Sequence, residues 1–206
     1  MTTIALFGTS ADPPTVGHAS ILEGLSQDFD QIAVWASDNP FKAHQVFLTH
    51  RQNMLALLIK DAVLPRQNVV LYPELSDPKA LTTVKVARSR WPEAEFTFVI
   101  GSDLLPKLNQ WYRIEAVLVQ VQLLIIPRPS YPLQEQDLDQ LRHKGAKIAI
   151  ANFTGPDVSS TAYRDQGIAG LTPAVASYIH QKQLYSCVEV GENRMEAAML
   201  PGPTVT

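Results

Sequence analysis

The stretch of sequence that decides the fold is Ile4-Ala5-Leu6-Phe7-Gly8-Thr9-Ser10-Ala11-Asp12-Pro13-Pro14-Thr15-Val16-Gly17-His18. It opens with a run of apolar residues, which predicts a short buried strand that stops at Gly8. Residues typical of turns follow. From Gly17 onward, apolar residues recur at steps of three and four, which is the spacing of a helix. The stretch therefore predicts a strand, a loop and a helix in succession.

The same unit recurs along most of the chain. Further apolar runs rich in β-branched residues predict strands at 32–36, 69–72, 96–100, 123–126 and 147–151. These runs are continuous rather than alternating, so both faces of the sheet should be covered by helices. The sequence therefore predicts an α/β fold, with a single Rossmann-like, mostly parallel sheet flanked by helices. We expect this domain to span residues 1–186, and residues 187–206, which lack periodicity, to form a mobile C-terminal tail.

Cap residues and helical spacing predict where several helices begin and end. Thr49, Ser159 and Thr172 are expected N-caps, and Pro173 would occupy the first helical position after Thr172. Gly145 is expected in the left-handed conformation that ends a helix. Helices are also predicted at 80–91, 113–120 and 173–184.

The composition excludes several classes of protein. The chain has 206 residues, a formal net charge of −3 and a sequence pI near 5.9, so it has no global attraction to nucleic acid or to an anionic membrane. Its one cysteine cannot form an internal disulfide, and its five histidines show no metal-ligand spacing, so we expect no metal ion held by the protein itself. No apolar stretch reaches the roughly 18 residues of a membrane-spanning helix, and no signal-like segment is found. A cytoplasmic protein without membrane or nucleic-acid partners is expected.

In open parallel sheets, ligands bind beyond the carboxyl ends of the strands, so the loops after the predicted strands are candidate sites. The loops that look suited to binding are 8–18, 37–42, 101–103 and 155–161. They contain neither a Gly-x-x-x-x-Gly-Lys-Ser/Thr phosphate loop nor the spaced glycines of a dinucleotide fingerprint. The chain also lacks a Gly-x-Ser-x-Gly elbow, so Ser10 is not an obvious hydrolase nucleophile.

The first of these loops has features that suit phosphate binding. Gly17 would let a ligand approach the backbone, the helix N-terminus would present free amides, and His18 could donate a directed hydrogen bond. The alternative interpretation is that Gly8 and Gly17 are ordinary turn glycines and that His18 is a surface residue of the helix.

A second cluster, Ser159-Ser160-Thr161, begins a later helix, and Arg164 follows four residues after Ser160. Hydroxyls, free amides and a guanidinium could converge there on a triphosphate. Alone, this cluster could equally be a serine cap with a solvated arginine. Two anion-competent helix starts, one after the first core strand and one after the last, together favour a nucleotide site.

These two clusters also carry a family resemblance. Segment 8–18 resembles the nucleotidyltransferase signature Gly-Thr-Phe-Asp-Pro-x-His/Thr-x-Gly-His, and segment 158–164 resembles its second signature, Ile-Ser-x-Thr-x-x-Arg. Thr15 in place of the first histidine and Ala11 in place of an aromatic residue depart from the usual pattern. Within this superfamily, the chain from about Ile4 to Tyr185 is similar to the nicotinate-nucleotide adenylyltransferase family, most clearly at 99–103, 111–112, 127–132 and 178–185.

The resemblance implies transfer of AMP from ATP to nicotinate mononucleotide, giving nicotinate adenine dinucleotide and pyrophosphate in NAD biosynthesis, with Mg²⁺ bound to the ATP phosphates. By the match, His18 would donate to the α-phosphate, and the catalytic residues would be His18, Thr15 and Arg164. The implied ATP-binding residues are Gly8, Thr9, Ser10, Gly17, His18, Gly101, Asp103, Ser159, Ser160, Thr161 and Arg164. The implied acceptor-binding residues are Lys42, Thr82, Trp111 and Tyr112, with the ring of Trp111 stacking on the pyridine.

Other functions remain open from the sequence. The same chemistry could act on nicotinamide mononucleotide or on phosphopantetheine, although the Trp111-Tyr112 pair disfavours pantetheine. A non-catalytic nucleotide-binding sensor is a further alternative. A homo-oligomer is compatible with the sequence, which does not give the oligomeric state.

Overall fold

The computed structural model of the chain describes residues 1–38, 46–155, 158–167 and 170–185. The tail predicted at 187–206 and the acceptor-binding candidate Lys42 lie outside this part of the chain.

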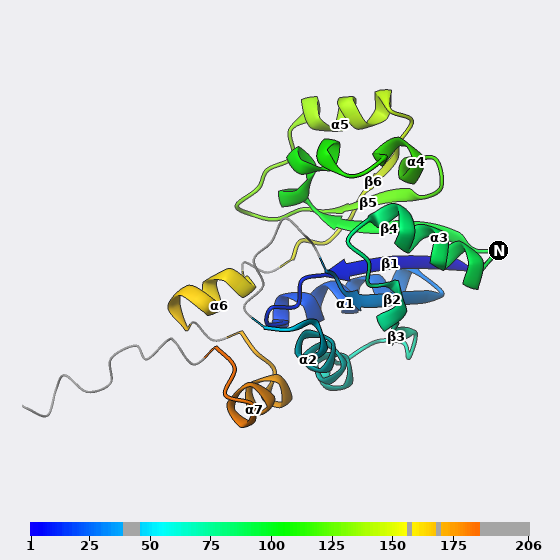
Figure 1. The fold of residues 1–206 in the computed structure, drawn as a ribbon. Coiled ribbons are helices and arrows are strands. Elements are labelled where there is room, and N and C mark those ends of the chain that lie inside the picture. The colour runs from blue at the N-terminus through cyan, green and yellow to red at the C-terminus, as the bar shows by residue number, and fades with distance from the viewer. Residues whose placement is uncertain (39–45, 156–157, 168–169, 186–206) are drawn as a thin grey trace, which may run out of the picture.

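Within the described residues, six strands form one sheet in the order β3-β2-β1-β4-β5-β6 (Figure 1). They are β1 (Thr3–Thr9), β2 (Gln31–Ala36), β3 (Val69–Leu71), β4 (Glu95–Gly101), β5 (Gln122–Ile126) and β6 (Lys147–Ile150). Every pair of neighbouring strands is parallel. This order is that of a doubly wound Rossmann sheet, so the predicted α/β fold is confirmed.

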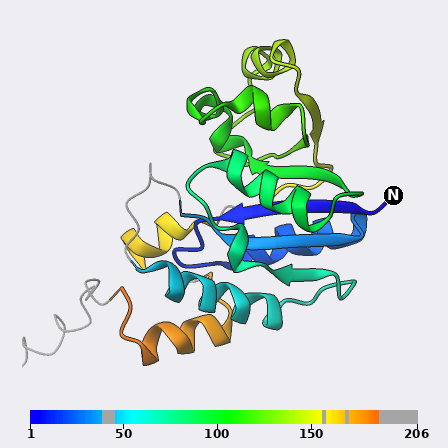
Figure 2. The ribbon, with the colours of Figure 1, turned by 45° about the vertical axis from the view of Figure 1, so that its right-hand side comes forward.

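The strands are connected by helices that cover both faces of the sheet (Figure 2). The α-helices are α1 (Val16–Asp28), α2 (Leu48–Asp61), α3 (Ala80–Arg90), α4 (Ile114–Leu118), α5 (Glu135–His143), α6 (Ser160–Gln166) and α7 (Pro173–Gln181). The described part of the chain also contains the 3-10 helices η1 (Pro73–Leu75) and η2 (Ser102–Gln110). Within the described ranges, no helix is long and apolar enough to cross a membrane.

The continuous apolar runs of the strands supply two hydrophobic cores. On β1, Ile4 and Leu6 enter one core, while Ala5 and Phe7 enter the other. The first core is closed by α3, α4, α5 and η2, and the second by α1, α2 and α7. Successive side chains of a strand point to opposite faces, so a strand between two helical layers must be apolar at nearly every position.

The topology places a crevice at the carboxyl ends of the central strands. After β1 the chain turns to α1 on one face, and after β4 it turns to η2 and α4 on the other face. The connections therefore diverge between two adjacent strands, which is the switch point where doubly wound sheets bind ligands.

Most predicted helix ends agree with the structure. Ser159 and Thr172 are N-caps, and Pro173 is at the start of α7. Gly145 has a φ of +87°, and the following amide, that of Ala146, donates to the carbonyl of Leu141 at 3.0 Å, which is the bond that closes a helix through a left-handed glycine.

Other predicted boundaries were wrong. Thr49 is not an N-cap, because α2 begins at Leu48 and the extended residue before it is Phe47. The last helix ends at Gln181 rather than near residue 184, because Gln183 adopts a left-handed φ of +51° and turns the chain away from the helix axis. The predicted helix at 113–120 is the shorter α4.

Candidate active site

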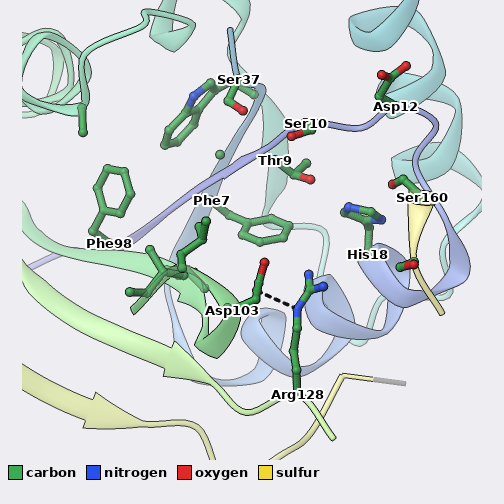
Figure 3. Close-up of a pocket in the computed structure, with 18 of the residues that line it drawn as sticks. Phe7, Thr9, Ser10, Asp12, His18, Ser37, Phe98, Asp103, Arg128 and Ser160 are labelled. Atoms are coloured by element: carbon green, nitrogen blue, oxygen red, sulfur yellow. Dashed lines mark ion pairs between the residues drawn. The ribbon is translucent and has the colours of Figure 1, made fainter. Parts of the chain in front are cut away.

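A large cavity of about 1100 Å³ lies at the carboxyl ends of the strands (Figure 3). Its size suits ligands of nucleotide class. Among the residues predicted from the sequence, those that line it are Gly8, Thr9, Ser10, His18, Gly101, Asp103, Trp111, Tyr112, Ser159, Ser160, Thr161 and Arg164. The structure thus brings the loop after β1, the loop after β4 and the start of α6 to one site.

His18 is held by the residue that caps its own helix. Thr15 is fully buried as the N-cap of α1, and its backbone N–H donates to Nδ1 of His18 at 3.0 Å. A backbone amide can only donate, so Nδ1 accepts with its lone pair and the neutral ring carries its proton on Nε2. His18 lines the cavity beside Thr9 and Ser160 (Figure 3). The ring therefore has an N–H donor that an anion in the cavity could use.

Two of the predicted site residues, Thr15 and Gly17, are next to His18 in the helix start but do not reach the cavity. Both are buried, and neither is among the described residues that line the cavity. The N–H of Val16, between them, donates to the carbonyl of Gly170 at 2.7 Å, which ties the start of α1 to the segment before α7.

The start of α6 is bonded to the loop after β1. Oγ of Ser159 accepts from the N–H of Ala162 at 3.0 Å, and Oγ of Ser160 donates to the carbonyl of Pro13 at 2.7 Å. Arg164 donates through Nη1 to the carbonyl of Asp12, and its Nη2 lies 3.3 Å from Oγ1 of Thr161. The two predicted anion-binding clusters are therefore joined directly by hydrogen bonds.

An ion pair lies on the opposite side of the crevice. Nε of Arg128 is 3.1 Å from Oδ1 of Asp103, and Figure 3 draws this pair between Phe98 and His18. A Cβ at Gly101 would lie 2.4 Å from Oδ1 of Asp103 and 2.9 Å from Nε of Arg128. Only glycine leaves room for this ion pair against the end of β4.

Aromatic rings line the other end of the cavity. Phe98 makes edge contacts with Trp35 and Trp111, with ring centroids 6.0 Å and 5.9 Å apart. Trp111 is half-buried, and the next residue, Tyr112, is exposed with Nζ of Lys79 lying 5.0 Å from its ring centroid. This end offers flat apolar surfaces with a cation at the rim, which suits an aromatic group that carries a negative charge.

One predicted acceptor-binding residue, Thr82, does not line the cavity. Ala80 and Thr83, also on α3, are among the described residues that do. The N–H of Thr82 donates to the carbonyl of Lys79 at 2.9 Å, so this amide is already used in the first turn of the helix.

Two cavity-lining cations were missed by the analysis of the sequence. Arg128 follows β5 and Lys79 lies between β3 and α3, and both line the cavity. The strand pattern points to both residues. All strands of a parallel sheet end at the same edge, so the loops after the third and fifth strands also reach the site.

Arg51 was also missed, and it shapes the site from within the protein. It is only 1% exposed, and its Nη1 donates to the carbonyl of Ser10 at 2.9 Å and to that of Ser37 at 2.6 Å. Burial lowers the pKa of its guanidinium, while the carboxylates of Asp12 and Asp38 raise it. Arg51 thus joins the loops that follow β1 and β2. No sequence pattern distinguishes it from a solvated helix arginine.

The chemistry of the site is that of anion binding. No group of three or more His, Cys, Asp or Glu side chains in the described part of the chain is placed to hold a metal ion. The cavity instead combines backbone amides at helix starts with His18, Arg128, Arg164 and Lys79. Such a set of donors can align phosphate groups and stabilise charge that develops on them.

Comparisons with known proteins agree with this chemistry. The cytidylyltransferase-like family model matches residues 6–166. A Synechocystis sp. protein named "Probable nicotinate-nucleotide adenylyltransferase" is 43% identical over 196 residues, covering 88% of this chain and 98% of the relative. The Bacillus subtilis protein named "Nicotinate-nucleotide adenylyltransferase" is 25% identical over 171 residues, covering 81% of this chain and 86% of the relative.

A solved structure supports the same fold. The Plasmodium falciparum nicotinic acid mononucleotide adenylyltransferase complexed with NaAD has a TM-score of 0.75 at 22% identity, and the match covers 90% of this chain and 98% of that chain. The family model spans well over half of the present chain, and the match to the Synechocystis relative covers most of it. The chain belongs to the nicotinate-nucleotide adenylyltransferase family.

Proposed function

We propose that the protein transfers the adenylyl group of ATP to nicotinate mononucleotide, forming nicotinate adenine dinucleotide and releasing pyrophosphate. The observation that carries this proposal is a cavity that joins helix starts suited to phosphate at one end to an aromatic surface with a cation at the other. The names of the relatives support the same reaction.

The reaction is a direct displacement at phosphorus. An oxygen of the mononucleotide 5′-phosphate forms a bond to the α-phosphorus of ATP, and the bond from that phosphorus to the oxygen bridging the α- and β-phosphates breaks. That bridging oxygen leaves as part of pyrophosphate. No covalent intermediate on the protein is needed, so the protein acts by aligning the substrates and stabilising negative charge.

His18 is placed to act on the α-phosphate. Its neutral ring carries the proton on Nε2, because Nδ1 accepts from Thr15. We assign to Nε2–H a hydrogen bond that strengthens as charge builds on the α-phosphate in the transition state. Thr15 is then a positioning residue that fixes the tautomer, and the backbone of Gly8, Thr9 and Ser10 borders the phosphate path.

The start of α6 is assigned to the β- and γ-phosphates. The hydroxyl of Ser160 is engaged with Pro13, so its contribution would be its backbone N–H. Arg164 uses one nitrogen on Asp12, but a guanidinium has five N–H donors and can bind phosphate with others. Gly101 and Asp103 are assigned to the adenosine, and Lys42, outside the described residues, stays a prediction for a further phosphate contact.

The acceptor is assigned to the aromatic end. The ring of Trp111 would stack on the pyridine, and Lys79 over Tyr112 would favour the carboxylate of nicotinate over an uncharged carboxamide. Nicotinamide mononucleotide has the same ring and is the second candidate acceptor. Phosphopantetheine has no aromatic ring to stack, so the site disfavours it.

Mg²⁺ is assigned to the substrate rather than to a protein-held site. The described residues do not bring three metal-ligating side chains together, so the ion would be bound by the ATP phosphates. When bound there, Mg²⁺ neutralises charge on the phosphates. A cytoplasmic location is part of the proposal, because both substrates are polyanions of the cell interior.

An acceptor panel tests the proposal. Pyrophosphate release is measured with ATP and nicotinate mononucleotide, nicotinamide mononucleotide or phosphopantetheine. Nicotinate mononucleotide should give the highest kcat/KM. Activity with phosphopantetheine alone would contradict the acceptor assignment. ATP binding by calorimetry without turnover of any acceptor would instead favour a nucleotide-binding sensor.

A further inference from the structure

The loop between β1 and α1, which we call the phosphate loop, contains a buried carboxylate, that of Asp12, and Asp12 is among the residues that line the cavity (Figure 3). Asp12 is 1% exposed, although it lies in the irregular segment between β1 and α1. Its Oδ1 accepts a hydrogen bond of 2.7 Å from the phenol of Tyr185. A buried carboxylate is costly unless it is bonded, so this contact matters for the conformation of the loop.

Tyr185 reaches Asp12 from the far end of the described chain. After α7, both Gln183 and Tyr185 adopt left-handed backbone conformations, with φ of +51° and +62°. Residues with a Cβ rarely adopt this conformation, so contacts made elsewhere must hold the turn in place. Tyr185 donates a hydrogen bond to Asp12, its ring packs edge-on against Tyr163 with centroids 5.9 Å apart, and it packs against the second hydrophobic core.

The protonation state of Tyr185 fits a donor role. Burial, followed by the hydrogen bond to Asp12, raises the pKa of its phenol above the ordinary value. The phenol therefore keeps its proton at neutral pH and donates it to the carboxylate. A hydrogen bond to an ionised acceptor is among the stronger kinds.

Other residues also hydrogen-bond to this loop, but they bind its backbone rather than the Asp12 side chain. Arg164 and Ser160 of α6 donate to the backbone carbonyls of Asp12 and Pro13, and Arg51 donates to that of Ser10. These bonds fix the backbone, whereas the bond from Tyr185 fixes the side chain of Asp12. Tyr185 is not among the described residues that line the cavity, whereas Asp12 is, so the hydrogen bond between them links Tyr185 to the site.

We propose that Tyr185 is a positioning residue for the phosphate loop, holding Asp12 inward so that the Ser10 to Thr15 segment keeps the shape in which it aligns ATP with the acceptor. This inference rests on the proposed function for its kinetic part. The segment between Asp12 and His18 contains Pro13, Pro14 and Thr15, so a shift of Asp12 is transmitted to the cap that holds the His18 ring.

The test uses Tyr185→Phe in the full chain, which removes only the hydroxyl and keeps the ring packing. Tyr163→Phe is the matched control, because it removes a hydroxyl from the ring that packs on Tyr185 and Tyr163 does not line the cavity described above. We expect Tyr185→Phe to lower kcat about tenfold, the effect of losing one hydrogen bond to a charged group. The KM for nicotinate mononucleotide should stay within about twofold, because its binding surface lies at the other end of the cavity.

A double-mutant cycle locates the effect on Asp12. In an Asp12→Ala background, Tyr185→Phe should cause no further loss of kcat. The proposal would be overturned by an unchanged kcat in Tyr185→Phe, by an equal loss in Tyr163→Phe, or by full additivity in the cycle. If Asp12→Ala does not fold, Asp12→Asn replaces it, and the loss caused by Tyr185→Phe should then shrink.

Hydrogen exchange separates this inference from the proposed function. Peptides covering residues 10–16 should exchange faster in Tyr185→Phe than in the wild type or in Tyr163→Phe. The faster exchange is expected even if the wild-type chain forms no dinucleotide. Failure to form the dinucleotide would refute the proposed reaction but not the positioning role of Tyr185. Unchanged exchange in these peptides would overturn the positioning role whatever the activity.

Discussion

The backbone N–H of Thr15 donates to Nδ1 of His18 at 3.0 Å, and this one hydrogen bond determines which nitrogen of His18 can serve the cavity. The cap of α1 and the candidate catalytic side chain are thus the same structural unit. Thr15 and His18 form the capping box of α1, so the residue at which the helix begins also orients the ring.

His18→Ala should lower kcat by at least about a hundredfold, the usual effect of removing one donor to a developing charge. His18→Gln should recover part of this loss, because its amide N–H can reach the region of Nε2, whereas the shorter His18→Asn should not. Steady-state pyrophosphate release measures all of them. Full activity in His18→Ala would show that the ring has no part in the chemistry.

Lys79→Gln should reduce the preference for nicotinate over nicotinamide mononucleotide. Nζ of Lys79 lies 5.0 Å from the ring centroid of Tyr112, at the rim of the aromatic end. Because this charge is exposed, kcat/KM for the nicotinate substrate should fall about five- to tenfold, with little change for the nicotinamide substrate. Lys85→Gln, on the helix α3 that begins just after Lys79 but outside the residues that line the cavity, is the control. An equal fall for both acceptors would contradict a role in selecting charge.

Arg51→Met should destabilise the fold as well as the site. The buried guanidinium donates to the carbonyls of Ser10 and Ser37, and its loss leaves both without this donor. The free energy of unfolding should fall by about 2 to 4 kcal/mol, and Arg51→Lys should not restore it, because one ammonium lacks the planar fork. Urea denaturation measures this, with exposed Lys60→Met on the same helix as the control. A change no larger than that of the control would show that these bonds add nothing to stability.

Tyr185→Phe should alter how stability depends on alkaline pH. Burial and the bond to Asp12 raise the pKa of this phenol in the folded chain. Above about pH 10, the unfolded chain releases the phenol proton while the folded chain keeps it, so the free energy of unfolding falls as the pH rises. The stabilisation that the buried Tyr185 phenol gives to the folded chain is complete below about pH 10 and is progressively lost above it. Denaturation at pH 8 to 11 should show a shallower alkaline decline in Tyr185→Phe than in the wild type, and identical declines would contradict the buried donor.

The strands and the site's location were predictable because each depends on local sequence. Runs such as that at 96–100 must be apolar on both faces, and parallel strands must end at one edge, where 8–18 and 159–161 then meet. By contrast, η2 was not predicted, because it contains Pro106, and a proline inside a helix removes a backbone donor and disfavours a regular α-helix.

The supporting contacts were not predictable because they join residues distant in sequence. Tyr185 and Asp12 are 173 positions apart, and Arg51 and Ser10 are 41 apart. Thr82 shows that the sequence can indicate a helix start without indicating which of its amides is free to bind a ligand. The sequence indicated the correct helix start, but an offset of a single residue decides whether an amide is free or already bonded within the first turn.

The most direct test of the account is the fate of isotopic label in one reaction. The chain is mixed with ATP, Mg²⁺ and nicotinate mononucleotide carrying ¹⁸O in its phosphate, and both products are analysed by mass spectrometry. Direct attack on the α-phosphorus predicts nicotinate adenine dinucleotide that retains all of the label, together with unlabelled pyrophosphate. Absence of the dinucleotide, or label in the pyrophosphate, would contradict the proposed reaction.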